Sequence, residues 1–260
     1  FLNGSEAGTG KTFPEIEFII ENKIKKTFII APAFLCYNWL SEINVYSGNA
    51  LKAVIYKKDL DPWANIHIIP YGRISSIIDE LKRAPPQIPQ LLISDECHYL
   101  CNPEAQRTRA FHHIVREFKP QFLHLLSGTS MRNRIPELYS LLLLLDYKYQ
   151  RGFSRKFPRQ ETFAESFCWP EVFYVGRRKI TKYGDSRNLS SLQEWLRPAY
   201  MRVLLTDIES IPELYHSEIS VDAVDVELDA ILEKEWKKYQ KTLDDFELLL
   251  NEDYNDPTSI

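Results

Sequence analysis

The sequence predicts an α/β fold, with a doubly wound, mainly parallel sheet that is flanked by helices. Two observations carry this prediction. Short apolar runs rich in Ile, Leu and Val recur along residues 1–148, and runs that are apolar on both faces are typical of central strands in a parallel sheet. Helical patterns separate these runs, and this alternation is the pattern of βαβ units.

Six strands and five helices are expected in this part of the chain. The first strand is expected to end near Leu2, where the chain as given begins. The remaining strands are expected over 27–31, 52–56, 65–69, 90–94 and 121–126. The helices between them are expected over 11–21, 36–46, 72–82, 104–117 and 133–147.

The pattern changes after residue 148. Residues 148–187 are rich in aromatic and basic side chains and show little periodicity. Asn188 is expected to cap a helix that carries Leu189, Leu192 and Leu196 on one stripe.

A short strand over 217–224 and a long acidic helix over 227–250 are expected next, which predicts an α-rich C-terminal extension. The expected organisation is therefore an α/β lobe over 1–148, a basic and aromatic insertion with closing helices over 149–206, and an acidic connector over 207–260.

The net charge of −4 hides an asymmetry along the chain. Residues 207–260 hold 16 acidic and 4 basic side chains, whereas residues 1–206 hold 28 basic and 20 acidic ones. Residues 147–187 contain ten Lys or Arg and four Asp or Glu. A basic body is compatible with a polyanionic partner, and a solvated charged face explains the charge equally well.

Composition excludes several classes of protein. The longest leucine-rich run, 138–145, is far shorter than the roughly 18 apolar residues that a membrane-spanning helix needs, and no secretory signal is visible. The four cysteines form no C-x-x-C pair, and Cys97, His98 and Cys101 match no common zinc spacing. We expect an intracellular protein without a membrane partner, cytoplasmic in a bacterium or phage and nuclear in a eukaryote.

The strongest local pattern is SEAGTGKT at residues 5–12, directly after the first expected strand. Gly8 and Gly10 permit backbone angles that other residues avoid, so successive N–H groups can converge on phosphate oxygens. The following helix N-terminus adds partial positive charge, Lys11 neutralises the β- and γ-phosphates, and the Thr12 hydroxyl is a candidate Mg²⁺ ligand. The strict pattern has Gly at the position of Ser5, and a glycine turn before a helix is the alternative for these eight residues alone. The expected ATP-binding residues are Gly8, Thr9, Gly10, Lys11 and Thr12.

A second pattern favours the ATP site over this alternative. The buried-strand run LLIS over 91–94 ends in Asp95 and Glu96. Ligands of open α/β sheets bind at the carboxyl ends of the strands. Asp95 is therefore expected to hold Mg²⁺, directly or through water, and Glu96 to orient and deprotonate the attacking water. The expected catalytic residues are Lys11, Asp95 and Glu96, and the expected metal ligands are Thr12 and Asp95.

These patterns, with others in the same order along nearly the whole chain, resemble the motifs of superfamily-two helicase-like ATPases, specifically the Swi/Snf-type DNA translocases. The compact spacing is most similar to the annealing-helicase branch. The resembling segments are 5–12 (motif I), Ile30-Ala31-Pro32 with Asn38-Trp39 and Glu42 (motif Ia), Ile69-Pro70-Tyr71 (motif Ib), 95–98 (motif II), 126–130 (motif III) and Tyr200-Met201-Arg202 (the segment that closes the first lobe).

The resemblance implies a RecA-like first lobe that binds ATP and Mg²⁺ and faces a second RecA-like lobe of the same polypeptide. Double-stranded DNA, bound with little sequence preference, is expected to lie across the two lobes. The residues expected to couple the nucleotide site to the DNA groove are His98, Ser127 and Thr129. The residues expected in the region of sugar-phosphate contacts, which position a duplex without reading its sequence, are Pro32, Asn38, Tyr71 and Arg73.

Four positions depart from the family pattern. Ser130 stands where the family has Pro, Cys101 where it has Lys, Val203 where a second Arg is usual, and Ser5 where Asp is common. The phosphate loop and both acids are nevertheless present, so ATP hydrolysis is expected. Without a second lobe and its arginine, worth about 10³–10⁵ in rate in other phosphoryl-transfer enzymes, the isolated chain is expected to turn over slowly. The alternatives are a non-catalytic, nucleotide-gated nucleic-acid-binding module and an RNA-directed helicase lobe.

Overall fold

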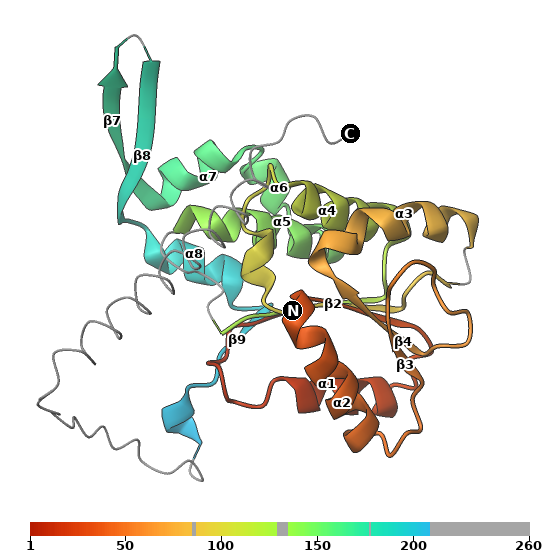
Figure 1. The fold of residues 1–260 in the computed structure, drawn as a ribbon. Helices are drawn as coiled ribbons and strands as arrows, with labels where there is room; N and C mark the ends of the chain where they lie inside the picture. Colours follow the sequence, from red (N-terminus) through yellow and green to blue (C-terminus); the bar gives the residue numbers. More distant parts are fainter. Residues whose placement is uncertain (85–86, 129–134, 177, 209–260) are drawn as a thin grey trace, which may run out of the picture. The chain divides into compact units, whose positions relative to one another are not determined.

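A computed structural model describes residues 1–84, 87–128, 135–176 and 178–208 of the chain. The seven strands of the main sheet are β1 (Leu2–Asn3), β2 (Thr27–Ala31), β3 (Ala53–Ile55), β4 (Ile66–Pro70), β5 (Leu91–Ser94), β6 (Phe122–Leu126) and β9 (Tyr200–Met201). Their order across the sheet is β3-β4-β2-β5-β6-β1-β9, and every pair of neighbours is parallel. The predicted doubly wound, mainly parallel sheet is confirmed (Figure 1).

Helices cover both faces of this sheet. The helices of the first 150 residues are α1 (Thr12–Glu21), α2 (Cys36–Tyr46), α3 (Ile74–Arg83), α4 (Gln106–Phe118) and α5 (Leu138–Tyr149). Helices α1 and α2 lie on one face, and α3, α4 and α5 lie on the other (Figure 1).

Strand β2 shows why both faces are covered. Phe28 and Ile30 pack into the core beneath α3, α4 and α5, while Ile29 and Ala31 pack into the core beneath α1 and α2. All four side chains are fully buried. Successive side chains of a strand point to opposite faces, so an uninterrupted apolar run needs helices on both sides. This is the physical reason that the sequence pattern predicted the fold.

Short 3₁₀ helices follow several strands and lead into the helices. They are η1 (Ala33–Leu35), η2 (Tyr71–Arg73), η4 (Cys97–Leu100), η5 (Ile135–Glu137) and η6 (Leu205–Asp207). The helix expected over 72–82 therefore begins as η2 and continues as α3.

The segment after α5 contains structure that the sequence pattern did not predict. Two short helices, α6 (Phe153–Lys156) and α7 (Gln160–Phe167), are followed by an antiparallel hairpin of β7 (Cys168–Val175) and β8 (Arg178–Ser186). Helix α8 (Leu189–Leu196) then leads to β9, which pairs with β1 and so returns the chain to the main sheet. The elements expected over 217–224 and 227–250 lie outside the described residues.

Asn188 stands at the N-cap position of α8, as expected, but the predicted capping bond is wrong. Its backbone is left-handed (φ 53°), and no side-chain cap bond is made. Its side-chain amide instead donates to the carbonyl of Ser166 at 2.9 Å, which joins the start of α8 to the end of α7. Among the described residues, no helix has the length and apolar character needed to cross a membrane.

Candidate nucleotide-binding site

Three loops meet at the carboxyl end of the central strands. The SEAGTGKT loop follows β1, the acidic pair follows β5, and Ser127 with Gly128 follows β6. Strand β6 lies between β5 and β1 and is parallel to both. The three loops therefore emerge side by side at the end of the sheet where ligands of open α/β folds bind.

The glycines of the phosphate loop have the conformation that the sequence predicted. Gly8 and Gly10 both have positive φ values, 86° and 73°, a region that favours glycine. Space remains above Gly10, because a Cβ built there meets no atom within 4 Å. Helix α1 starts at Thr12, so its N-terminus points its unpaired N–H groups toward this loop.

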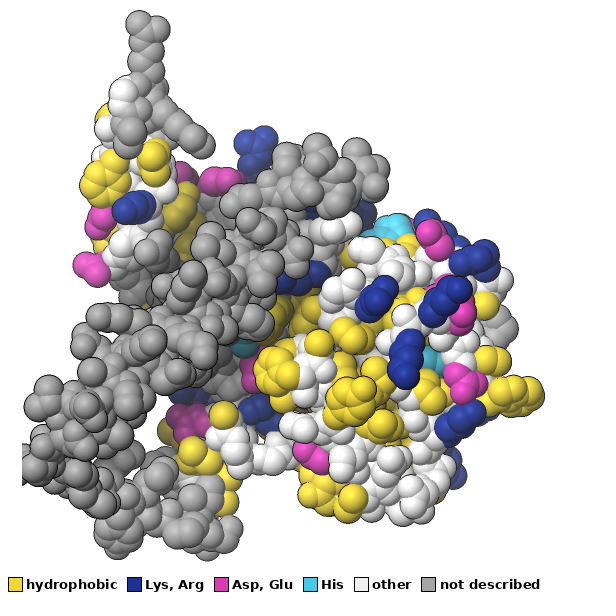
Figure 2. All heavy atoms as spheres, in the orientation of Figure 1, with side chains coloured by type: hydrophobic (Ala, Val, Ile, Leu, Met, Phe, Trp, Pro, Cys, Tyr) yellow, Lys and Arg dark blue, Asp and Glu magenta, His cyan; other side chains and the backbone are white. Residues whose placement is uncertain are grey.

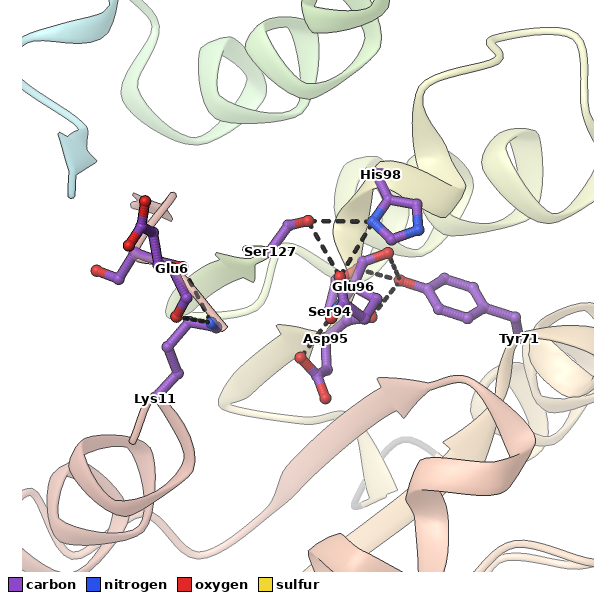
Figure 3. Close-up of polar contacts among 9 residues, drawn as sticks. Glu6, Lys11, Tyr71, Ser94, Asp95, Glu96, His98 and Ser127 are labelled. Atoms are coloured by element: carbon purple, nitrogen blue, oxygen red, sulfur yellow. Dashed lines mark hydrogen bonds and ion pairs between the residues drawn. The ribbon is translucent and has the colours of Figure 1, made fainter. Parts of the chain in front are cut away.

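Lys11 lies over its own loop. Its Nζ donates to the carbonyl oxygens of Ser5 at 3.0 Å and Glu6 at 2.8 Å (Figure 3). The hydroxyl of Thr9 donates to the same Glu6 carbonyl at 2.8 Å. The ammonium is thus held at the phosphate loop by neutral acceptors, which are weaker partners than phosphate oxygens.

Hydrogen bonds with Val203 and Leu205, almost 200 positions later in the chain, hold the phosphate loop in place. The Val203 N–H donates to Ser5 Oγ at 3.0 Å, and the Glu6 N–H donates to the Val203 carbonyl at 3.0 Å. The Leu205 N–H donates to Glu6 Oε2 at 2.9 Å. Ser5, which departs from the strict motif, therefore has a structural role, and Val203 takes part through its main chain.

Gly128, after β6, approaches the same loop from the other side. A Cβ on Gly128 would lie 3.0 Å from the backbone nitrogen of Ala7, which is closer than ordinary van der Waals contact. The loops after β1 and β6 therefore lie close together, and a side chain at position 128 would require the backbone at Ala7 to shift.

Asp95 is held by two donors. Trp39 Nε1 donates to its Oδ2 at 2.8 Å, and the Glu96 N–H donates to its Oδ1 at 2.9 Å. Burial raises the pKa of Asp95 above its usual range, opposed by the Trp39 hydrogen bond and, more weakly, by the charge of Lys11. Each carboxylate oxygen keeps a further lone pair, so the group can also ligate a cation.

Glu96 has a left-handed backbone (φ 49°), which is costly for a residue with a side chain and is often found at functional sites. Its Oε2 accepts from Ser127 Oγ at 3.2 Å and lies 3.0 Å from His98 Nδ1. His98 Nδ1 also lies 3.1 Å from Ser127 Oγ. The hydrogen bond from His98 lowers the pKa of Glu96, outweighing the opposite effect of burial.

The structure therefore brings His98 and Ser127, two of the three predicted coupling residues, into direct contact with Glu96 (Figure 3). The third, Thr129, lies outside the described residues, as does Ser130.

The Tyr71 hydroxyl holds the acidic turn in place through hydrogen bonds. Its hydroxyl donates to the Asp95 carbonyl at 2.8 Å and lies 2.7 Å from Ser94 Oγ, with a longer contact of 3.4 Å to the Glu96 carbonyl (Figure 3). Its ring is stacked on Tyr99 and is buried. Burial also raises the pKa of the Tyr71 phenol well above its usual value, so the hydroxyl keeps its proton.

The expected nucleic-acid residues divide into two pairs. Asn38 and Arg73 are exposed, whereas Pro32 and Tyr71 are buried. Pro32 occupies the N-cap position of η1, and the Tyr71 hydroxyl donates to the Asp95 carbonyl. The assignment of these four residues to the region of sugar-phosphate contacts stays a prediction.

The sequence places Trp39 in motif Ia but does not predict that its indole N–H donates to Asp95. No spacing rule connects two residues 56 positions apart. The signal was the family-like Asn38-Trp39 pair, which marks the position without revealing the contact.

The donor set fits a magnesium ion shared with phosphate. Mg²⁺ prefers oxygen ligands, and proteins commonly supply one or two of them while substrate phosphates and water supply the rest. The Thr12 hydroxyl at the start of α1 and the Asp95 carboxylate are oxygen groups of this kind and are the candidate ligands. Within residues that the structure describes, no group of three His, Cys, Asp or Glu side chains is arranged to hold a metal by itself. Cys97, His98 and Cys101 thus form no such group.

Comparison with known proteins identifies the family. Residues 3–254 match the SNF2-related domain. The chain is 27% identical over 252 residues to the DNA annealing helicase and endonuclease ZRANB3 of Homo sapiens, covering 91% of this chain and 22% of that protein. It is 30% identical over 174 residues to the uncharacterized ATP-dependent helicase YqhH of Bacillus subtilis, covering 62% of this chain and 29% of that protein. The chain thus spans about a fifth to a third of the length of these relatives.

Solved structures show the same fold. The SWI2/SNF2 ATPase core of Sulfolobus solfataricus in complex with double-stranded DNA matches with a TM-score of 0.54 at 18% identity, over 78% of this chain and 40% of that one. The same core domain, in a second structure, matches with a TM-score of 0.57 at 19% identity, over 81% and 41%. The predicted RecA-like, Swi/Snf-type lobe is confirmed, and the chain belongs to the SNF2-related domain family.

Proposed function

We propose that this chain is the ATP-binding and ATP-hydrolysing first lobe of a translocase that moves on double-stranded DNA. The observation that carries the proposal is the meeting of the phosphate loop and the acidic turn at one end of the sheet, on either side of β6. Membership of the SNF2-related family supports it, as do relatives named as an annealing helicase and as an ATP-dependent helicase.

The phosphate loop binds the triphosphate. The N–H groups around Gly8, Thr9 and Gly10 line the cradle, and Lys11 exchanges its carbonyl acceptors for charged phosphate oxygens, which make hydrogen bonds about twice as strong as neutral ones. Thr12 and Asp95 hold Mg²⁺, which supplies positive charge against the phosphate oxygens when it is bound.

Glu96 orients the attacking water and accepts its proton. The hydrogen bond from His98 favours the ionised form of this carboxylate and lowers its pKa. Ser127 holds the same oxygen from the loop after β6, so a shift of that loop changes the position of the base. We propose that His98, Ser127 and Thr129 link nucleotide state to movement in this way.

Duplex DNA is the proposed partner, together with a second RecA-like lobe of the same polypeptide. The Sulfolobus solfataricus SWI2/SNF2 ATPase core was solved with double-stranded DNA. Asn38 and Arg73 are exposed, and we propose that they contact the phosphate backbone. The lobe itself is proposed to comprise 1–148 with its closing segment 149–206, followed by the connector 207–260.

The test combines Mg²⁺-dependent ATP binding with turnover in the full-length polypeptide. Lys11→Ala is expected to abolish binding of a fluorescent ATP analogue. Glu96→Gln is expected to keep binding and to lower duplex-stimulated turnover by about 10²- to 10⁴-fold, the usual contribution of a positioned base. Lys25→Ala and Glu21→Gln, both exposed at or beyond the far end of α1, are matched controls that leave binding and turnover unchanged.

Three outcomes contradict the proposal in different ways. Unchanged turnover in Glu96→Gln removes the catalytic assignment. ATP binding without any DNA-stimulated turnover, with the second lobe present, identifies a nucleotide-gated binding module. Stronger stimulation by RNA than by duplex DNA identifies an RNA-directed lobe.

A further inference from the structure

The β7–β8 hairpin projects from the lobe instead of packing along it (Figure 1). It is fastened at its base, where Cys168 pairs with Ser186 and the Arg187 N–H donates to the Phe167 carbonyl at 2.8 Å. Figure 2 shows hydrophobic side chains along its visible surface. The hairpin is thus an arm that presents its side chains to solvent.

Large aromatic side chains lie exposed on this arm. The side chains of Trp169, Phe173 and Tyr174 are 57%, 46% and 71% exposed. Exposed apolar surface that is gathered in one place marks a site of interaction. Phe173 and Tyr174 are neighbours in β7 and therefore lie on opposite faces of the hairpin. Trp169 lies at the base of the arm, where the pairing register shifts between Cys168 and Pro170.

A cationic side chain lies near each of the Trp169 and Phe173 rings. The Arg187 guanidinium lies 4.6 Å from the centre of the Trp169 ring, and Lys182 Nζ lies 5.5 Å from the centre of the Phe173 ring. The Arg187 guanidinium also donates to the Glu165 carbonyl, and Glu171 lies directly opposite Lys182 in the ladder. Residues 168–187 hold five Lys or Arg and two Asp or Glu, so the arm is basic as well as aromatic.

This combination identifies the occupant by its chemistry. Exposed aromatic rings stack on the faces of unpaired bases, and neighbouring cations attract the phosphates of the same strand. Along a duplex the base faces are already stacked on one another, so the interior of a duplex offers these rings no partner. The basic charge of the arm also argues against a purely apolar protein surface as the partner.

We propose that the β7–β8 hairpin binds single-stranded DNA next to a duplex, by stacking unpaired bases on Trp169 and Phe173 while Lys182 and Arg187 contact the adjoining phosphates. The inference deepens the proposed function, on which it rests: it assigns a duplex with a single-stranded branch or tail as the preferred substrate. The site is separate from the phosphate loop and from Asn38 and Arg73.

The test measures the affinity of the whole chain, without nucleotide, for a single strand, a blunt duplex and a tailed duplex by fluorescence anisotropy. The double variant Trp169→Ala/Phe173→Ala is expected to bind the single strand and the tailed duplex about 10- to 100-fold more weakly and the blunt duplex unchanged. Trp169→Phe/Phe173→Tyr keeps two rings for stacking and is expected to retain most of the affinity.

A 5-iodouracil in the single-stranded tail supplies an independent readout. It is expected to form a photo-crosslink to Trp169 or Phe173 in the unaltered chain. Trp63→Ala, which removes an 81% exposed tryptophan beside the far side of the sheet, is the matched control and leaves every affinity unchanged. The unfolding midpoint of the double variant is expected to stay close to that of the unaltered chain, because about half of each substituted side chain is already exposed.

Equal weakening on all three DNAs, no weakening, or a crosslink elsewhere overturns the inference, and tighter binding of an RNA tail overturns its assignment to DNA. Its failure is distinguishable from failure of the proposed function. Hairpin-dependent tail binding without duplex-stimulated ATP hydrolysis removes the translocase and keeps the hairpin site. If the duplex stimulates hydrolysis but the hairpin variants bind the tail as tightly as the unaltered chain, the hairpin site is removed and the translocase is kept.

Discussion

The phosphate loop and the acidic turn lie at the same end of one sheet, but different kinds of contact hold them in place. The acidic turn is fixed by side chains that reach it from neighbouring elements, chiefly Tyr71 and Trp39. The phosphate loop is fixed by main-chain groups of Val203 and Leu205, which arrive from the end of the described chain. The difference indicates that the turn is preformed by the central sheet, whereas the loop depends on how the chain closes after α8.

Among changes to the contacts that hold these two regions in place, the largest effect is expected from removing a donor at the acidic turn. Trp39→Phe leaves Asp95 Oδ2 without the indole N–H and removes the hydrogen bond that opposes the rise of its pKa by burial. Because loss of a group that orients a metal ligand commonly costs about 10- to 100-fold in affinity or activity, the Mg²⁺ dependence of ATP binding is expected to weaken by that factor. Titration with Mg²⁺ measures it, with Trp63→Phe, at an exposed tryptophan, as the control.

Tyr71→Phe tests whether the turn is preformed. The substitution takes a hydroxyl from a buried cluster in which the Ser94 hydroxyl and the Asp95 carbonyl are its partners. Leaving buried polar groups unpaired costs about 1–3 kcal/mol, so the free energy of unfolding by urea is expected to fall by that amount. Tyr37→Phe, at a tyrosine that is 69% exposed, is expected to change it little, and equal effects in both variants would break the comparison.

Ser5→Ala tests whether the phosphate loop is held by the chain segment that follows α8. It removes the hydroxyl that accepts from the Val203 N–H, a neutral hydrogen bond worth about 1 kcal/mol. Amide hydrogen exchange at Val203 is expected to accelerate about fivefold, whereas exchange in β5 stays unchanged. The exposed Ser41→Ala is the control, and equal acceleration in β5 would mean that the loop is not a separately held unit.

The smallest effect concerns pH. The hydrogen bond from His98 lowers the pKa of Glu96, so the ionised base persists to lower pH than an ordinary glutamate and is lost as the pH falls through this lowered pKa. His98→Ala is expected to move the acid limb of the kcat/KM profile of the full-length protein to higher pH. His98→Asn, which keeps a donor, is expected to move the acid limb less. An acid limb that does not move in His98→Ala would show that this limb does not report the ionisation of Glu96.

The sequence predicted those parts of the molecule that depend on local pattern. Strand β2 and helix α2 begin and end at the expected residues, because the apolar pattern that defines each of them lies within a few consecutive positions. The phosphate loop was also predictable, since Gly8 and Gly10 are dictated by backbone angles within a single turn.

The remainder depends on contacts between distant residues or on pairing without a strong pattern. The bond from Trp39 to Asp95 and that from Val203 to Ser5 join segments that only the finished sheet brings together. The β7–β8 hairpin was missed because its aromatic side chains face solvent on both sides and therefore show no alternation between apolar and polar residues. Alternation of apolar and polar residues predicts a strand only where one face of that strand packs against a core.

Strand β9 has one more consequence, for the outermost position of the sheet. Strand β1 is two residues long. The N–H groups of Leu2 and of Gly4, which follows the strand, donate to the carbonyls of Ala199 and Met201. A protein shortened to end before residue 199 would leave those N–H groups unpaired at the edge of the sheet, where they can pair with another molecule. Shortened versions of this lobe that are meant to stay monomeric must therefore extend at least through Met201.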